Sequence, residues 1–120
     1  MLNLDTHILV YAMTGDVTAR ETRLLRSARW GISAIVLWEL AKLVQLGRIE
    51  VDLDAPELGR FLANVHVWPL TIEIARALRR VDVRSDPADE IIAATSLVHA
   101  APLLTRDRKL LGSKVVPLAR

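Results

Sequence analysis

Residues 2–13 read LNLDTHILVYAM and combine a first strand with a first helix. Residues 2–4, with leucine at both ends, predict a short strand, and Asp5 and Thr6 open a helix over about 6–13 with no loop between them. A strand that passes directly into a helix is typical of parallel α/β sheets. Asp5 is therefore expected at the edge of the sheet where such folds place their ligands.

The same alternation of strands and helices continues along the chain. Further strands are expected at 30–33, 65–70, 103–105 and 114–117, with a short exposed extended segment at 48–54. Further helices are expected at 17–28, 34–46, 56–64, 71–80, 87–100 and 106–111, with Gly47 as the C′ residue of the second of these. This order implies right-handed βαβ crossovers. We predict a single α/β domain over residues 1–120, with three α/β/α layers and a central, mainly parallel sheet.

Four acidic residues follow the predicted strands or lie in the helix that comes next. They are Asp5, Glu39, Asp89 and Asp107. Because the carboxyl ends of parallel strands share one edge of the sheet, these carboxylates are expected to converge. Converging carboxylates repel one another unless a positive group lies among them, and a divalent cation with oxygen ligands is the simplest candidate. The pattern indicates a metal-dependent hydrolase.

Three of these acids also have a structural interpretation. Asp5 can be the N-cap of its helix, and Asp107 can begin the helix at 106–111. Asp89 falls at position N3 of a helix whose N-cap is Asp86, where a carboxylate can complete a capping box. Capping needs one acid or two, however, and Glu90 makes this first turn more acidic still.

Glu39 is harder to explain structurally. Three of its four neighbours one helical turn away are apolar, so its carboxylate is expected to point inward. Burial of an unpaired carboxylate is unfavourable, and Lys42, an arginine from elsewhere or a metal must compensate for it. Thr6 and Thr105 bring hydroxyl groups to the same edge of the sheet, where they can orient acids or bind water.

Composition narrows the class of protein. The hydrophobic fraction of 52% suits a sheet that is covered on both faces. No apolar run approaches the roughly 20 residues that cross a bilayer, and residues 1–13 lack the basic region of a signal peptide, so we expect no membrane association. The absence of cysteine excludes disulfides and thiolate metal sites and suits a cytoplasmic protein.

The charge distribution favours an anionic polymer as a partner. Without the four clustered acids, sixteen basic residues face ten acidic ones, and thirteen of the basic residues are arginine. Arginine suits bidentate contact with phosphate, although solvated helix faces explain any single arginine equally well. The three histidines are not at metal-ligand spacing, and the chain has no Walker A loop, no dinucleotide-binding glycine motif and no cysteine nucleophile.

Four short motifs, in this order, resemble those of the PIN domain family. They are Leu4-Asp5-Thr6-His7, Trp38-Glu39-Leu40, Asp86-Pro87-Ala88-Asp89 with Ile91-Ile92-Ala93-Ala94 after it, and Leu104-Thr105-Arg106-Asp107. More narrowly, the chain resembles the VapC-type toxins of bacterial type II toxin–antitoxin modules. The resemblance covers essentially the whole length of the chain.

This resemblance implies a small endoribonuclease that uses Mg²⁺ or Mn²⁺ to hydrolyse structured RNA, such as tRNA or ribosomal RNA. Asp5, Glu39, Asp89 and Asp107 would be its catalytic and metal-binding quartet, supported by Thr6, Asp86 and Thr105. Within the quartet, we expect Asp5, Asp89 and Asp107 to hold the cation directly, and Glu39 to orient its water or complete a second site. Arg84 and Arg106 would position the RNA backbone without contacting its bases. Such proteins are usually homodimers, silenced by a VapB-like antitoxin.

Two other interpretations remain open. Relatives with this motif commonly carry arginine after Asp89, whereas this chain carries Glu90, so a PIN-like domain that binds RNA or protein without cutting is one alternative. The other is a receiver domain with Asp54 as its phosphoacceptor. Receivers, however, have paired acids after the first strand and a lysine after a late strand, where this chain has only Asp5 and Arg106.

Overall fold

A four-stranded parallel sheet forms the centre of the computed structural model, which describes residues 1–120. The strands are β1 (Leu2–Leu4), β2 (Trp30–Ser33), β3 (His66–Trp68) and β4 (Leu103–Leu104). Their order across the sheet is β3-β2-β1-β4, and every pair of neighbours is parallel. The carboxyl ends of all the strands therefore lie at one edge.

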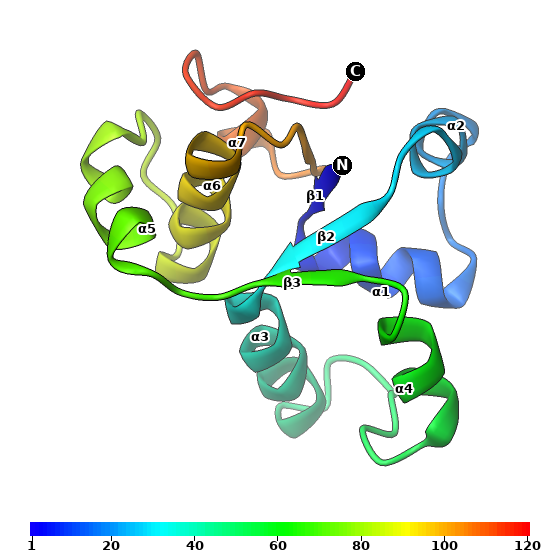
Figure 1. The fold of residues 1–120 in the computed structure, drawn as a ribbon. Helices are drawn as coiled ribbons and strands as arrows, with labels where there is room; N and C mark the ends of the chain where they lie inside the picture. The colour runs from blue at the N-terminus through cyan, green and yellow to red at the C-terminus, as the bar shows by residue number, and fades with distance from the viewer.

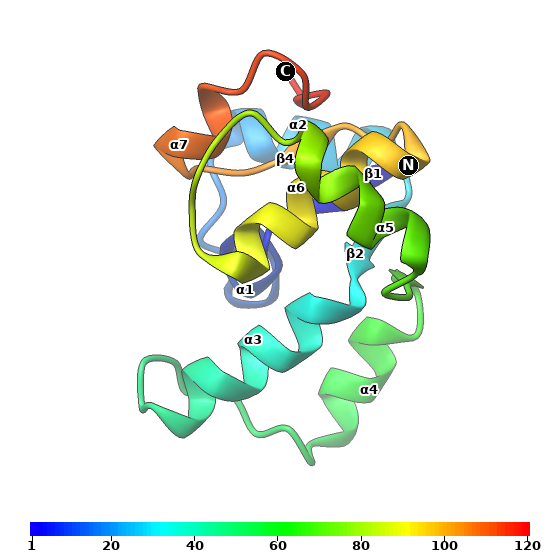
Figure 2. The same cartoon turned by 90° about the vertical axis from the view of Figure 1, so that its left-hand side faces the viewer.

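Helices cover both faces of this sheet. They are α1 (Thr6–Thr14), α2 (Ala19–Ser27), α3 (Ala34–Gln45), α4 (Pro56–Leu62), α5 (Ile72–Ala77), the 3₁₀ turn η1 (Leu78–Arg80), α6 (Pro87–His99) and α7 (Arg108–Leu111). Figure 1 shows α5 and α6 on one side of the sheet and α1 and α2 on the other, while α3 and α4 lie together at the lower end of the molecule in Figures 1 and 2. The predicted three-layer α/β/α architecture is confirmed.

The order of the strands creates a switch point beside β1. The chain passes from β1 outward through β2 to β3 and then returns to the opposite side of β1 to form β4. In open parallel sheets, ligands bind outside the carboxyl ends of the strands where the order reverses in this way. A functional site is therefore expected at the end of β1.

The core is built on the buried central strands. Leu2, Leu4, Ile32, Leu103 and Leu104 are each at most 5% exposed, as expected for strands covered on both faces. They pack into one cluster with the inner faces of the helices. In β2, Gly31 lies against the indole ring of Trp68. A Cβ atom at this position would lie 2.5 Å from the ring, so only glycine fits there.

One predicted strand is wrong. Residues 114–117 form no strand, because the Asp82 carboxylate accepts hydrogen bonds from the Ser113 hydroxyl and the Lys114 amide and holds them in a turn. The chain pairs with β4 slightly later, where Leu103 N–H donates to the carbonyl of Pro117 and Ala119 N–H donates to that of Leu103, both at 2.8 Å. The sequence pattern missed the turn because the residue that stabilises it lies far away in the sequence.

Other differences concern the lengths of elements. Residues 48–54 alternate in sequence but form no strand, and the helix predicted at 71–80 divides into α5 and η1. The last helix begins at residue 108, since the residue before it serves as the N-cap. Gly47 adopts a φ of 70° after α3, as a C′ glycine should. No helix has both the length and the apolar character needed to cross a bilayer.

Candidate metal centre

Asp5 is fixed at the end of β1 by the start of α1. It is the N-cap of that helix, and its Oδ1 accepts a hydrogen bond from the Thr6 amide at 2.7 Å. Its other carboxylate oxygen accepts a hydrogen bond of 2.6 Å from the Thr105 hydroxyl at the end of β4. The side chain is only 4% exposed. The N-cap interpretation of Asp5 is therefore correct, and it places the carboxylate at the switch point.

Glu39 and Asp89 reach the same place from two other helices. Glu39 lies on α3, and its Oε1 accepts a hydrogen bond from the Thr6 hydroxyl. Asp89 lies in the first turn of α6, and its Oδ2 accepts a hydrogen bond from the Ser85 hydroxyl at 2.8 Å. Carboxylate oxygens of Asp5, Glu39 and Asp89 all lie within 4.8 Å of one another, and we call these three residues the acidic trio.

Ser85 was missed by the sequence analysis. It stands one residue before the N-cap of α6, outside the predicted helix. The only available signal was its position four residues before an acid, which is weak without the fold. Each member of the trio thus has its own hydroxyl donor: Thr105, Thr6 and Ser85 for Asp5, Glu39 and Asp89, respectively.

The acidic trio lines a cavity, and Asp107 lines that cavity too but does not belong to the trio. It is the N-cap of α7, and its Oδ1 accepts hydrogen bonds from the amides of Lys109 at 2.8 Å and Leu110 at 3.3 Å. Its own amide donates to the Thr105 hydroxyl at 3.0 Å. The cavity has a volume of about 300 Å³ and is lined by Asp5, His7, Tyr11, Glu39, Asp86, Asp89, Arg106 and Asp107.

Two neighbours of Asp89 have different roles. Asp86 stands at the N-cap of α6 but caps it with no side-chain hydrogen bond, which leaves its carboxylate at the cavity. Glu90 instead accepts a hydrogen bond from the Ser85 amide at 3.1 Å and does not line the cavity. The capping box expected for Asp89 is absent. Glu90, the residue that departs from the family pattern, keeps its carboxylate outside the lining of the cavity.

Burial disfavours the charged form of two members of the trio, Asp5 and Asp89. Burial raises the pKa of Asp5 above its ordinary value, against hydrogen bonds from Thr105 and Thr6 that lower it. Burial also raises the pKa of Asp89, with contributions from the charges of Asp5, Asp107 and Asp86. Ionised acids in this position need a cation, and a set of carboxylate oxygens suits a hard divalent ion. The donor set therefore fits the predicted metal.

The two arginines predicted to contact RNA are placed differently. Arg84 is exposed, contacts the carbonyl of Val81 at 3.4 Å and does not line the cavity. Arg106 does line it, but its guanidinium is paired with Glu21: Nη2 lies 2.7 Å from Oε1 and Nε lies 2.8 Å from Oε2. No other basic side chain except His7 faces the cavity.

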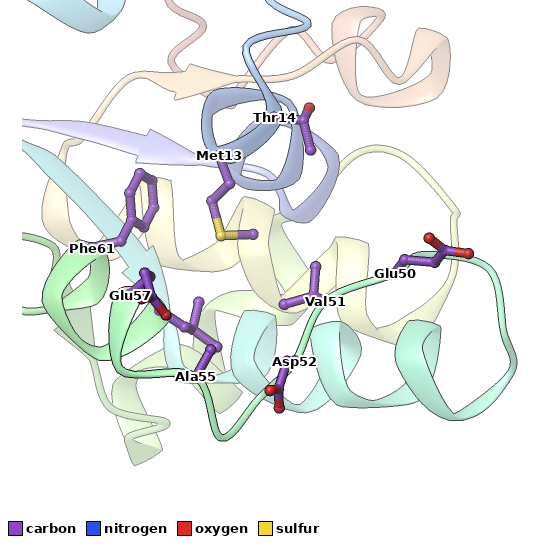
Figure 3. Close-up of a pocket in the computed structure, with 9 residues that line it drawn as sticks. Met13, Thr14, Glu50, Val51, Asp52, Ala55, Glu57 and Phe61 are labelled. Carbon is purple, nitrogen blue, oxygen red and sulfur yellow. The ribbon is translucent and has the colours of Figure 1, made fainter.

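A second cavity, of about 330 Å³, lies between the end of α1, residues 50–55 and α4. Figure 3 shows Met13 and Val51 facing each other there, while the carboxylates of Glu50 and Asp52 point away. The trio is the one group of three or more acidic or histidine side chains close enough to share a metal ion. Asp54, the alternative phosphoacceptor, is exposed in a loop and lines neither cavity.

Known proteins resemble this chain in sequence and in fold. The family model of the PIN domain matches residues 3–112. Ribonuclease VapC22 of Mycobacterium tuberculosis is 32% identical over 83 residues, which are 66% of this chain and 63% of that protein. The match thus spans a little less than two thirds of the length of that relative.

Solved structures share the fold over nearly the whole chain. A toxin–antitoxin complex from Klebsiella pneumoniae has a TM-score of 0.73 at 18% identity and covers 99% of this chain and 97% of its own. VapBC2 from Rickettsia felis, bound to a DNA fragment from its promoter, also has a TM-score of 0.73, at 20% identity with 99% and 98% coverage. FitAcB from Neisseria gonorrhoeae has a TM-score of 0.68 at 22% identity, with 100% and 97% coverage.

Proposed function

The chain belongs to the PIN domain family, and we propose that it is a metal-dependent endoribonuclease acting as the toxin of a VapBC-type toxin–antitoxin module. The observation that carries this proposal is the convergence of Asp5, Glu39 and Asp89 within 4.8 Å at the switch point of the sheet. The resemblance to Ribonuclease VapC22 supports RNA as the substrate.

The acidic trio would hold the cation, Mg²⁺ or Mn²⁺. The geometry favours Glu39 over Asp107 as the third ligand, because Glu39 brings a carboxylate oxygen within 4.8 Å of oxygens of Asp5 and Asp89, whereas Asp107 lies outside this group. Asp107 then contributes negative charge from the wall of the cavity, where it can bind a second cation or a water molecule. This assignment differs from the one that the motifs alone suggest, in which Glu39 is the outer residue.

The hydroxyl groups of Thr6, Ser85 and Thr105 would orient the three carboxylates. Each donates to one oxygen of its acid, so the remaining lone pairs are left for a ligand. When bound, a divalent cation lowers the pKa of water and stabilises charge on phosphate oxygens. The cavity is open to solvent, and Asp86 at its rim can bind a water molecule for hydrolysis of a phosphodiester bond.

We propose a cognate VapB-like antitoxin and a second copy of this chain as partners in the cytoplasm. Support for the antitoxin comes from neighbours of the same fold that were solved as toxin–antitoxin complexes. Support for a homodimer comes from exposed apolar side chains after β2 and β3: Trp38 is 56% exposed, Leu70 52% and Ile72 58%. Aromatic residues such as tryptophan are enriched at protein–protein interfaces.

Incubation of the purified chain with total tRNA and ribosomal RNA tests this function. We expect discrete fragments in Mg²⁺ or Mn²⁺ and intact RNA in EDTA, with 5′-phosphate ends on the products. If RNA binds but stays intact with every metal, the chain is a silent PIN-like binding module instead. The position of Glu90 outside the cavity argues against that outcome, because the acidic cavity keeps its composition.

A further inference from the structure

Arg106 lies in the turn between β4 and α7, and its side chain contacts residues that are distant in sequence. Its guanidinium pairs with both oxygens of Glu21 on α2 and donates a third hydrogen bond, of 2.9 Å, to the carbonyl of Asp16. Its Cζ atom also lies 4.0 Å from the centre of the Tyr11 ring on α1. One side chain thus joins α1, α2 and the turn after β4.

These contacts leave Arg106 poorly suited to bind phosphate. Three of its five N–H groups are already bonded, and its charge is balanced by a carboxylate that is 4% exposed. The pairing with Arg106 lowers the pKa of Glu21 to about 2, so the carboxylate is ionised at neutral pH. An RNA phosphate would have to compete with a bidentate partner that is part of the fold.

The segments that Arg106 joins are the ones that carry the acids. Asp5 is the N-cap of α1 and Asp107 the N-cap of α7, so a shift of either helix start moves a carboxylate. Between them, the Thr105 hydroxyl donates to Asp5 and accepts the amide hydrogen of Asp107. The backbone of Arg106 lies between Thr105 and Asp107, which these hydrogen bonds hold in place.

We propose that Arg106 is a positioning residue of the metal centre: its pairing with Glu21 fixes the turn at residues 105–107, and with it the acidic cavity. The proposal rests on the metal-binding function proposed above. It assigns Arg106 and Glu21 to the metal site, and it removes Arg106 from the RNA-binding surface.

Calorimetric titration of Mn²⁺ into the full chain tests this assignment. Glu21→Gln and Arg106→Gln should each weaken Mn²⁺ binding by about threefold to tenfold, which is less than removal of a direct partner of a ligand causes. The double variant should bind no more weakly than either single one, because both substitutions break the same pairing. Binding of fluorescent tRNA in EDTA should be unchanged in all three, and raised Mn²⁺ concentrations should restore kcat without altering KM for RNA.

Two control variants separate positioning from general stability. Thr18→Ala removes the hydroxyl that caps α2 but keeps the Glu21–Arg106 pair, and Arg108→Gln removes a neighbouring exposed arginine. Both should bind Mn²⁺ with wild-type affinity. Circular dichroism would confirm that every variant is folded. If Arg106→Gln unfolds, Glu21→Gln still tests the pairing, because its amide oxygen can accept the hydrogen bond from the Thr18 amide.

Several results would overturn the assignment. Wild-type Mn²⁺ affinity in both Glu21→Gln and Arg106→Gln would do so, as would an equal loss in Thr18→Ala. A loss of tRNA affinity in EDTA with normal Mn²⁺ binding would return Arg106 to the RNA-binding surface. If the wild-type chain itself binds no Mn²⁺, the proposed function fails as well, and that result is distinct from all the others.

Discussion

At the scale of single residues, the candidate site consists of three acids, each paired with one hydroxyl group. The sequence was sufficient to select the acids and two of the hydroxyls, because Asp5, Thr6 and Thr105 stand directly at the ends of strands. Ser85 could not be selected, since its bond to Asp89 depends on how the loop before α6 folds back. The pairing of Arg106 with Glu21 could not be predicted either, because the two residues are 85 positions apart in sequence.

Substitution of Thr105 by valine tests the paired hydroxyls. Valine keeps the shape but cannot donate to Asp5 or accept from the Asp107 amide, so Mn²⁺ affinity should fall by roughly 10- to 100-fold. The lost hydrogen bonds should lower the free energy of unfolding by about 1–3 kcal/mol. Calorimetry and urea unfolding measure the two effects. Thr105→Ser, which keeps the hydroxyl, should stay near wild type; equal Mn²⁺ affinity in the valine variant would be inconsistent with the proposed role.

Substitution of Asp5 by asparagine tests the buried acid itself. The variant should lose detectable cleavage and most Mn²⁺ binding, because a neutral amide is a poor ligand for a hard cation. Its melting temperature without metal should equal or exceed that of the wild type, since burial disfavours the charged form of Asp5. Differential scanning fluorimetry checks the stability. Undiminished cleavage by this variant would exclude Asp5 from the chemistry.

At the scale of secondary structure, helix starts were the best-predicted features. The N-cap residues Asp5 and Asp86 stand where the sequence signals place them, whereas Asp107 caps a helix that begins two residues later than predicted. The failed strand at 114–117 depends instead on a tertiary contact, the hydrogen bonds that Asp82 accepts from Ser113 and Lys114. Local chemistry therefore predicts where the acids lie along the chain, and the fold decides which of them meet.

The junction between α2 and the turn after β4 should depend on pH. The pKa of Glu21 is lowered from 4.5 to about 2, so its stabilising contribution is present above pH 4.5 and is lost as the pH falls from there to about 2. The contribution is at most about 3 kcal/mol, and less in practice because Arg106 is partly exposed to solvent. Urea unfolding of wild type and Glu21→Gln between pH 2 and pH 6 measures it. The two curves should converge at low pH; a constant difference would contradict the assigned pKa.

At the scale of the whole molecule, the sheet order brings distant acids to one edge and leaves the remaining surface basic. The parallel order β3-β2-β1-β4 follows from the alternation of strands and helices, but the side of β1 on which β4 lies cannot be derived from a local pattern. That choice places Thr105 and Asp107 beside Asp5. The excess of basic residues elsewhere then suits a polyanionic substrate that approaches an acidic cavity through a bound cation.

Binding of Mn²⁺ should stabilise the whole fold, and more so at neutral pH. At a metal concentration one hundred times Kd, the free energy of unfolding should rise by about 2.7 kcal/mol at pH 7. The pKa values of Asp5 and Asp89 are raised in the folded chain. Without metal, protonation of these two acids therefore stabilises the fold at low pH, and this stabilisation is lost as the pH rises through their pKa values. Protons therefore compete with the metal, and the stabilisation should shrink toward pH 4. Thermal unfolding at both pH values checks this, and an unchanged melting temperature at pH 7 would argue against a metal centre.

Substitution of an exposed apolar residue tests the proposed homodimer. Ile72 is 58% exposed at the start of α5, where a charge in an interface would be unfavourable. Ile72→Glu should give a monomer by light scattering, whereas Leu111→Glu, on the short helix α7, should keep the wild-type mass. A wild-type chain that is itself monomeric at micromolar concentration would contradict the homodimer.

The most direct test of the metal centre is to measure the rate of tRNA cleavage and Mn²⁺ binding in one titration, for the wild type and for Asp89→Asn. The wild-type rate should follow the occupancy of the metal site, and Asp89→Asn should lose both signals together because its carboxylate belongs to the acidic trio. Cleavage that persists in EDTA, or that proceeds at the wild-type rate in Asp89→Asn, would contradict a metal centre built from these acids.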